Sequence, residues 1–480
     1  MKSVAFNKTS VWIFSAIVVL FFIVLAIQFQ AFYLALAPFA VLIITYFIFN
    51  IEWSFDLLLL SIPISINLGS ETSLNFDFPD EILMILNSFL ALFYMIKNKA
   101  YFDKSFFKHP LVILILLSFL WTLLSALFSY DFFLSIKFVF KKMWYLLPFF
   151  FFAYPYFSDK KNQVKGFQLL FIPFLFILFF VVYNYSKLGF KFEEVHEPIQ
   201  PFFVNHVIYG AMISSFFPLI VAAYFLSKKL SLQKLVVFVG ILLFLFCIYF
   251  SYSRAAWAAT FFAGMVYVLV RLKIMHFAIL GFYFLIITSL FYVSKNNTYI
   301  SLRPNLDRTY MHDNLQDHII ATFKGEDISS AERFHRWIAA LNMWKKHPLF
   351  GYGPNTFYEH YKPYLNNLFK TWVSRNPERS TTHNYFLFML TEQGFPAMLL
   401  YALLIYFIFY SGQKCYHRLA DKREKIILIA VLGMLGAVFV NNFFSELLEQ
   451  DKLGSLFFIG ISIILGFEMK RLKTKKNQLT

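Results

Sequence analysis

Charged residues are scarce in this chain of 480 residues. Asp, Glu, Lys and Arg together make up 15% of the sequence, whereas 59% of it is hydrophobic and 21% is aromatic. A soluble domain needs more polar surface than such a composition provides. The sequence therefore predicts a protein that is embedded in a membrane.

Cysteine is scarcer still, and the motifs of several enzyme classes are missing. The two cysteines, Cys247 and Cys415, fall in an expected helix and an expected inner loop, which argues against a disulfide framework. The chain has no HExxH, no CxxC pair and no ordered Asp-rich loop that would indicate a metal site. It has no nucleotide-binding P-loop either. We therefore expect no metal, no other cofactor and no ATP-driven transport.

Two acidic segments keep a metal or sugar site open as an alternative. The segment 67–80 carries acids without Lys or Arg, and a later turn carries Glu446, Glu449 and Asp451. Either segment could hold a divalent cation. Isolated acids at a membrane surface are ordinary, however, so a solvated loop explains the first segment more simply.

Apolar runs of membrane-spanning length recur along the whole chain and predict helices rather than a barrel. The expected spans lie near 11–28, 31–49, 54–67, 81–96, 111–128, 143–156, 166–185, 204–225, 235–251, 255–270, 275–293, 384–410, 426–441 and 453–469. The fold class that follows is an all-α polytopic membrane protein with about 12–14 transmembrane helices. Most of its helices are expected to contact membrane lipids.

The net charge of +16 indicates topology rather than a nucleic-acid partner. With the N-terminus in the cytoplasm, the dense basic loops all fall on the cytoplasmic side, at 97–108, 160–165, 228–234, 271–273, 414–425 and 471–476. The C-terminus is then cytoplasmic as well. The region 129–142, whose lysines fall on the outer side, is the exception.

Three domains follow from this topology. Residues 1–293 form transmembrane helices with short loops, 294–383 form an outer cap, and 384–480 form the last transmembrane helices and a basic tail. Within the cap, Ser329 and Glu332 have the spacing of a capping box, which predicts a helix that starts there and stops at Pro348. The Gly-Tyr-Gly-Pro-Asn sequence at 351–355 predicts a turn.

Two arginines on the outer side are candidates for anion binding. Arg254 follows a tight turn at the start of a span, where a guanidinium must either reach the interface or meet an anion. Phosphate suits it, because the planar guanidinium bonds two oxygens at once and stays charged. Arg333 and Trp337 are four residues apart on one helix face, so the aromatic ring would orient the arginine.

Two histidines lie where the outer loops meet the membrane. His206 begins a span and could bond a phosphate or a sugar hydroxyl, or only water. His383 directly precedes Asn384 and an apolar run, and an imidazole there suits a general base, although a boundary histidine bonded to backbone is the ordinary alternative. Asn384 is a substrate-binding candidate by its position. Glu392, inside the span, is expected to have a partner or a function.

Three blocks of sequence carry a family resemblance. They are S-R-A-A-W at 253–257, E-R-F-H-R-W-I-A-A-L-N-M-W-K-K-H-P-L-F-G-Y-G-P-N-T-F at 332–357, and H-N-Y-F-L-F-M-L-T-E-Q-G at 383–394. In their order, and in the long loop before the His-Asn pair, they resemble the O-antigen ligase and polymerase superfamily of bacterial integral membrane glycosyltransferases. The similarity covers roughly residues 200 to 410.

The resemblance implies a GT-C-like, metal-independent enzyme of the bacterial inner membrane. Such an enzyme takes a glycan from undecaprenyl diphosphate and joins it to an acceptor hydroxyl on the periplasmic face. Carried onto this chain, Arg254 and Arg333 would hold the diphosphate, and His383 would deprotonate or orient the acceptor. Arg336 could exchange roles with Arg333. A base on the far side of the anomeric carbon predicts inversion.

Several functions remain open at this stage. A ligase with lipid A-core as acceptor is the first interpretation, followed by a polymerase that uses a second lipid-linked repeat. An oligosaccharyltransferase acting on protein hydroxyls comes third. A non-enzymatic transporter of lipid-linked glycans should show ionisable residues near the bilayer midplane and internal repetition, and the sequence shows neither clearly.

Overall fold

The structure, a computed structural model, shows a helical bundle with one short hairpin. It describes residues 16–21, 37–68, 77–229, 231–304, 327–371 and 380–479, with the single positions 13, 28, 320 and 374. Within these residues the only strands are β1 (Ile66–Asn67) and β2 (Asp77–Phe78), which pair antiparallel. The prediction of an all-α polytopic membrane protein is confirmed.

The helices follow one another with short connections. Before the cap they are α2 (Ala37–Phe49), α3 (Ile51–Ile64), α4 (Asp80–Lys97), α5 (Lys104–Phe107), α6 (Pro110–Leu127), α7 (Phe132–Leu146), the π-helix η2 (Leu147–Phe152), α8 (Ala153–Ser158), α9 (Lys160–Lys187), α10 (His206–Leu226), α11 (Leu232–Phe250), α12 (Arg254–Arg271) and α13 (Met275–Ser294). In the cap they are η3 (Lys295–Leu302), α15 (Ile328–Lys346), α16 (Phe357–His360), η4 (Lys362–Tyr364) and η5 (Asn367–Phe369). After the cap they are α17 (Tyr385–Arg418), α18 (Lys422–Phe444), η6 (Leu447–Glu449) and α19 (Asp451–Leu479).

Fewer helices in the described part of the chain have the length and composition of a membrane span than the 12–14 expected. Among the described residues, 8 helices are long and apolar enough to cross a membrane, or up to 9 if the bent pair α2 and α3 forms one span. The expected span near 54–67 corresponds to α3, which has 14 residues and is bent by 111° from α2. The expected span near 143–156 is divided among α7, η2 and α8. The expected span near 11–28 lies largely outside the described residues.

Two further expected spans, near 81–96 and 255–270, correspond to helices with charged ends. α4 begins with Asp80 and Glu81 and ends with Lys97. α12 has an arginine at each end, which lowers its mean hydropathy. The difference between the expected and the described spans thus comes from short, bent and charge-ended helices, and from residues outside the described part of the chain.

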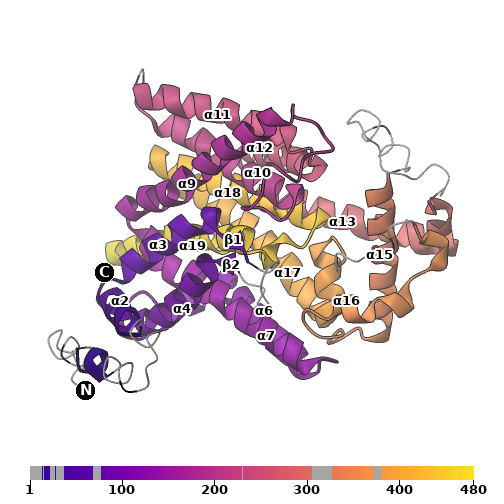
Figure 1. Ribbon diagram of the computed structural model, residues 1–480, viewed down its shortest axis with the longest axis horizontal. Helices are drawn as coiled ribbons and strands as arrows, with labels where there is room; N and C mark the ends of the chain where they lie inside the picture. The colour runs from indigo at the N-terminus through magenta and orange to yellow at the C-terminus, as the bar shows by residue number, and fades with distance from the viewer. Residues whose placement is uncertain are drawn as a thin grey trace.

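The last helices form the centre of the bundle. The apolar span of α19 is 100% buried and that of α18 is 78% buried, whereas only 6% of the α13 span is buried. α10 and α12 pack against α18, and α6 packs against α17. Figure 1 shows α17, α18 and α19 between α9 to α12 on one side and α4 to α7 on the other. The cap helices α15 and α16 lie at one end of this bundle, beside α17.

The glycine-rich turn of the cap docks into a break in α17. The break is at Gly394, whose φ of +79° is in the left-handed region that favours glycine. Across the break, the backbone N–H of Gly353 donates to the carbonyl of Glu392 at 2.8 Å, and that of Phe395 donates to the carbonyl of Pro348 at 2.9 Å. The cap is thus hydrogen-bonded to the interior of a membrane helix.

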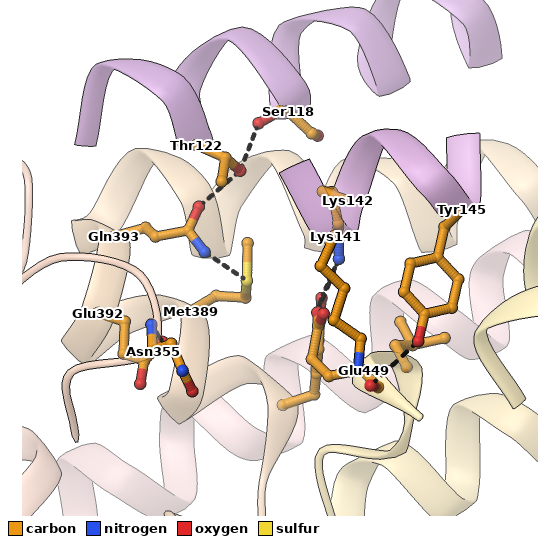
Figure 2. Close-up of polar contacts among 12 residues, drawn as sticks. Ser118, Thr122, Lys141, Lys142, Tyr145, Asn355, Met389, Glu392, Gln393 and Glu449 are labelled. Carbon is orange, nitrogen blue, oxygen red and sulfur yellow. Dashed lines mark hydrogen bonds and ion pairs between the residues drawn. The ribbon is translucent and has the colours of Figure 1, made fainter. Parts of the chain in front are cut away.

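Two side chains of α17 complete this docking (Figure 2). The Glu392 carboxylate accepts hydrogen bonds from the backbone N–H groups of Asn355 at 2.5 Å and Phe357 at 3.0 Å. The amide oxygen of Gln393 accepts from the Thr122 hydroxyl of α6 at 2.7 Å. The buried carboxylate therefore has the partner that its position requires. The Gly-Tyr-Gly-Pro-Asn turn at 351–355 and the Glu-Gln-Gly break at 392–394 are thus bonded to each other, and we call this contact the joint between the cap and α17.

Candidate active site

Arg254 is the first residue of α12 and follows a tight turn. Tyr252 in this turn has a φ of +51°, and the Ser253 side chain caps the helix by accepting from the N–H of Ala256 at 3.4 Å. The Arg254 guanidinium donates to the carboxylate of Asp327 at 2.9 Å. The Asp327 side chain is only 1% exposed and lies at the start of α15. This ion pair joins a helix of the membrane domain to the cap.

The start of α15 differs from the predicted capping box. The helix begins at Ile328, and Asp327 is its N-cap, because its carboxylate accepts from the backbone N–H of Ser330 at 2.9 Å. Glu332 does not close a capping box with Ser329. Its carboxylate lies 3.7 Å from Arg336. The prediction was therefore wrong about the cap, although it found the helix.

Arg333 and Arg336 of α15 have different surroundings. Arg336 is 7% exposed, donates to the Thr381 carbonyl at 3.4 Å and pairs with Glu332. The Nε of Arg333 is buried, and no described residue forms a hydrogen bond or an ion pair with this guanidinium. Burial, and then the nearby Arg254 guanidinium, lower the pKa of Arg333 to about 10. Arg336 is held by the protein, and Arg333 remains available for an anion.

Trp337 connects α15 to the segment that leads into α17. Its indole N–H donates to the carbonyl of Thr382 at 2.9 Å, and its ring lies 6.5 Å from that of Phe443. Among the described residues, no cation–π contact joins Trp337 to Arg333. The indole thus braces the cap helix against the membrane domain rather than orienting Arg333.

His383 lies between two residues with structural roles. Its φ of +51° places it in a left-handed turn, directly after Thr382. Asn384 on its other side is the N-cap of α17, because its side chain accepts from the N–H of Leu387 at 3.0 Å. The same side chain donates to the carbonyl of Phe443 at 2.9 Å. Asn384 therefore fixes the backbone beside His383.

The imidazole of His383 faces the two arginines of α15. Burial first, then Arg336 and Arg333, lower the pKa of His383 to about 3. An additional positive charge beside two guanidiniums is unfavourable, so the ring stays neutral at physiological pH. A neutral imidazole can accept or donate a hydrogen bond, but in this environment it is a weak base.

Glu446, in the turn between α18 and η6, is a further acid close to these cations. Burial raises the pKa of its carboxyl. The Thr381 hydroxyl, Arg336, the His383 backbone N–H and Arg333 act in the opposite direction. Its Oε2 is buried and has no hydrogen-bond partner among the described residues. The structure thus places a carboxylate beside His383 and both arginines of α15.

One part of the sequence matches a known family. Residues 238–402 match the O-antigen ligase family. This part of the chain is an O-antigen ligase family domain. No curated protein matches the sequence.

The O-antigen ligase domain contains the three predicted catalytic residues, Arg254, Arg333 and His383. Arg333 interacts electrostatically with Arg254 and with His383, so its guanidinium is within electrostatic range of both. The three residues come from α12, from α15 and from the turn before α17. Residues 254 and 383, which are 129 positions apart in sequence, are thus related through Arg333 of the cap.

His206 and Glu446 lie outside the O-antigen ligase domain. His206 begins α10, and its ring lies 4.9 Å from that of His196. One turn further on, a Cβ at Gly210 would lie 2.9 Å from the Cβ of Ser253, so the start of α10 is beside the Arg254 turn. The role of His206 in substrate binding stays a prediction.

Sequence reasoning missed two carboxylates of this site, Asp327 and Glu446. Asp327 precedes the predicted helix start by two residues, and an Asp before a helical stretch is a cap signal that could have found it. Glu446 was considered only as one of three acids in a turn. No spacing relates it to His383, because the two come from different helix ends that meet only in the fold.

Proposed function

We propose that this protein is a membrane glycosyltransferase of the O-antigen ligase type. It would move a glycan from undecaprenyl diphosphate to an acceptor hydroxyl, with lipid A-core as the first candidate. The observation that carries this proposal is the guanidinium of Arg333, which is buried beside Arg254 and forms no ion pair or hydrogen bond with a described residue. A buried charge is costly unless it is compensated, and a bound diphosphate would compensate it.

The chemistry follows from where charge develops in the reaction. As the bond between the sugar C1 and the diphosphate oxygen breaks, the leaving diphosphate gains negative charge. Arg254 and Arg333, fixed by α12 and α15, would stabilise this charge more in the transition state than in the ground state. The two guanidiniums provide the positive charge that this step needs, so the proposed reaction is metal-independent. Attack from the opposite face of the sugar would invert the anomeric centre.

The role of His383 in this proposal is to orient the acceptor. The neutral imidazole can accept a hydrogen bond from an attacking hydroxyl and hold its oxygen toward C1. A diphosphate bound between the arginines would also reduce the positive potential at the ring. Arg336 and Trp337 would act indirectly, because they hold the segment 381–383 in place.

The site would lie on the periplasmic face of a bacterial inner membrane, with both termini in the cytoplasm. The distribution of basic loops supports this orientation, since the cap end of the bundle lies opposite the dense Lys and Arg loops at 160–165 and 414–425. The lipid tail would enter sideways between helices, and the cap would cover the sugars.

Lipopolysaccharide from a strain that lacks this gene tests the proposal. Loss of a ligase leaves bare core together with long undecaprenyl-linked chains. Loss of a polymerase instead leaves core that carries a single repeat, and loss of an oligosaccharyltransferase leaves lipopolysaccharide unchanged but removes glycan from proteins. A strain whose lipopolysaccharide, undecaprenyl-linked glycans and glycosylated proteins are all unchanged would contradict the proposed activity.

A further inference from the structure

Glu446 differs from the other acids of its turn in forming no ion pair with a described residue. Glu449 accepts from Lys142 at 2.7 Å and from the Tyr385 hydroxyl at 2.7 Å (Figure 2). Asp451 accepts a hydrogen bond from the Tyr145 hydroxyl. No described residue forms an ion pair with Glu446, whose Oε2 is buried and unbonded. The Glu446 carboxylate is thus not part of an ion pair between the described helices.

The backbone on both sides of Glu446 is fixed. Before it, the carbonyl of Phe443 accepts from the Asn384 side chain at 2.9 Å. After it, the N–H of Leu448 donates to the Asn442 side chain at 3.0 Å, and Leu448 is buried in the core. The turn is therefore tied to the residue that follows His383, so Glu446 and His383 keep a constant relative position.

The groups that face the Glu446 carboxylate come from two other elements. Arg333 and Arg336 approach it from α15, and the Thr381 hydroxyl and the His383 backbone N–H approach it from the segment before α17. The two arginines keep the carboxylate in an electropositive environment, and burial makes it a better proton acceptor than a solvated glutamate. His383, in contrast, is kept neutral by burial and by the same arginines.

We propose that Glu446 is the group that takes the proton from the acceptor hydroxyl, while His383 positions that hydroxyl. This inference rests on the proposed glycosyl transfer. In the step, the acceptor oxygen forms a bond to C1 of the sugar, and the bond between C1 and the diphosphate oxygen breaks. The electron pair of that bond leaves with the diphosphate, against Arg254 and Arg333. The hydroxyl proton moves to the Glu446 carboxylate, which becomes a neutral acid and later releases the proton to water.

The experiment uses the full-length protein in nanodiscs, with two substitutions at this position. Glu446→Gln keeps the size of the side chain and removes the base, and Glu446→Asp keeps a base on a shorter side chain. Glu359→Gln is the matched control, because Glu359 is an exposed carboxylate of the cap, away from the turn that carries Glu446. The probes are undecaprenyl diphosphate for binding, and undecaprenyl-diphosphate-linked glycan with lipid A-core for transfer.

Glu446→Gln is expected to bind undecaprenyl diphosphate like the wild type but to transfer glycan at least about 100-fold more slowly. Glu446→Asp is expected to restore part of the rate. The wild-type rate should fall on the acid side as Glu446 becomes protonated, at a pH above the ordinary glutamate pKa of about 4.3. In Glu446→Gln this acid limb should disappear from the residual rate. The Glu359→Gln control should bind and transfer normally.

Three results would overturn the inference. Glu446→Gln could transfer at the wild-type rate, or its residual activity could keep the acid limb. It could also lose diphosphate binding and transfer together, which would make Glu446 a structural counter-charge for the arginines. A wild-type protein that transfers no glycan to any tested acceptor would overturn the proposed function itself, and the first three results would leave that function standing.

Discussion

The guanidinium of Arg254 lies 2.9 Å from the carboxylate of Asp327, and this ion pair joins the first turn of α12 to the first turn of α15. Asp327 also caps α15 through the backbone N–H of Ser330. The Asp327 carboxylate thus caps α15 and also forms an ion pair with Arg254, the arginine that would bind diphosphate. A diphosphate would compete with Asp327 for Arg254, so the contact couples substrate binding to the position of the cap.

Replacing Asp327 separates these two roles. Asp327→Asn keeps a side-chain oxygen for the N-cap but loses the charge, and Asp327→Ala loses both. We expect Asp327→Ala to lower the free energy of unfolding by about 1 kcal/mol more than Asp327→Asn does, which is the value of a cap. Both should bind inorganic diphosphate at lower concentration than the wild type does, because Arg254 is released. Chemical unfolding and diphosphate titration in detergent measure the two effects, and equal stability of the two variants would contradict the capping role.

Arg333 and Arg336 are expected to respond in opposite ways to substitution by alanine. Arg333→Ala removes a buried charge without a described partner, so stability should be unchanged or higher while transfer falls by about 100-fold or more. Arg336→Ala removes the bonds to Glu332 and the Thr381 carbonyl and should lower stability by about 1–3 kcal/mol. Thermal unfolding alongside a transfer assay distinguishes them. An active Arg333→Ala protein would remove Arg333 from the proposed site.

The low pKa of His383 predicts a specific dependence of stability on pH. The imidazole binds a proton less tightly in the folded protein, where its pKa is about 3, than in the unfolded chain, where it is about 6.5. Its contribution to stability is complete above about pH 6.5 and is lost progressively as the pH falls toward 3. His383→Asn tolerates the positive φ and cannot titrate. The variant should therefore lose less stability than the wild type between pH 7 and pH 5, and parallel curves would contradict the buried, neutral imidazole.

The joint between the cap and α17 depends on Gly394. A side chain there would be strained by the φ of +79°, and its Cβ would collide with the carbonyl of Leu349. The left-handed conformation alone costs about 1–2 kcal/mol for a residue other than glycine. Gly394→Ala should therefore reduce the yield of monodisperse protein and abolish transfer. Gly264→Ala is the control, since nothing lies within 4 Å of a Cβ at that position in α12. Equal behaviour of the two variants would contradict the docking of the turn.

Local signals in the sequence predicted the parts of the cap that depend on local chemistry. Pro348 ends the helix as expected, since α15 stops at Lys346. The predicted turn at 351–355 contains Gly351, Gly353 and Asn355, all with positive φ. These features were predictable because proline narrows the range of allowed backbone angles and glycine widens it, whatever the surrounding fold.

The features that depend on contacts between distant segments were not predictable in the same way. Trp337 shares a helix face with Arg333. Its indole N–H nevertheless donates to the carbonyl of Thr382, which is 45 residues away in the sequence. Asn384 was a substrate-binding candidate because of its position beside His383. In the structure its side chain caps α17 and donates a hydrogen bond to the carbonyl of Phe443. Polar side chains at the edge of a membrane satisfy backbone groups first, and sequence alone does not show which groups come near.

The most direct test of the account is a cryo-electron microscopy structure of the full-length protein in nanodiscs with undecaprenyl diphosphate. The account predicts that the diphosphate lies between the guanidiniums of Arg254 and Arg333, with the His383 ring facing it and Asp327 displaced from Arg254. Diphosphate bound elsewhere on the bundle, with the ion pair of Arg254 and Asp327 intact, would contradict it.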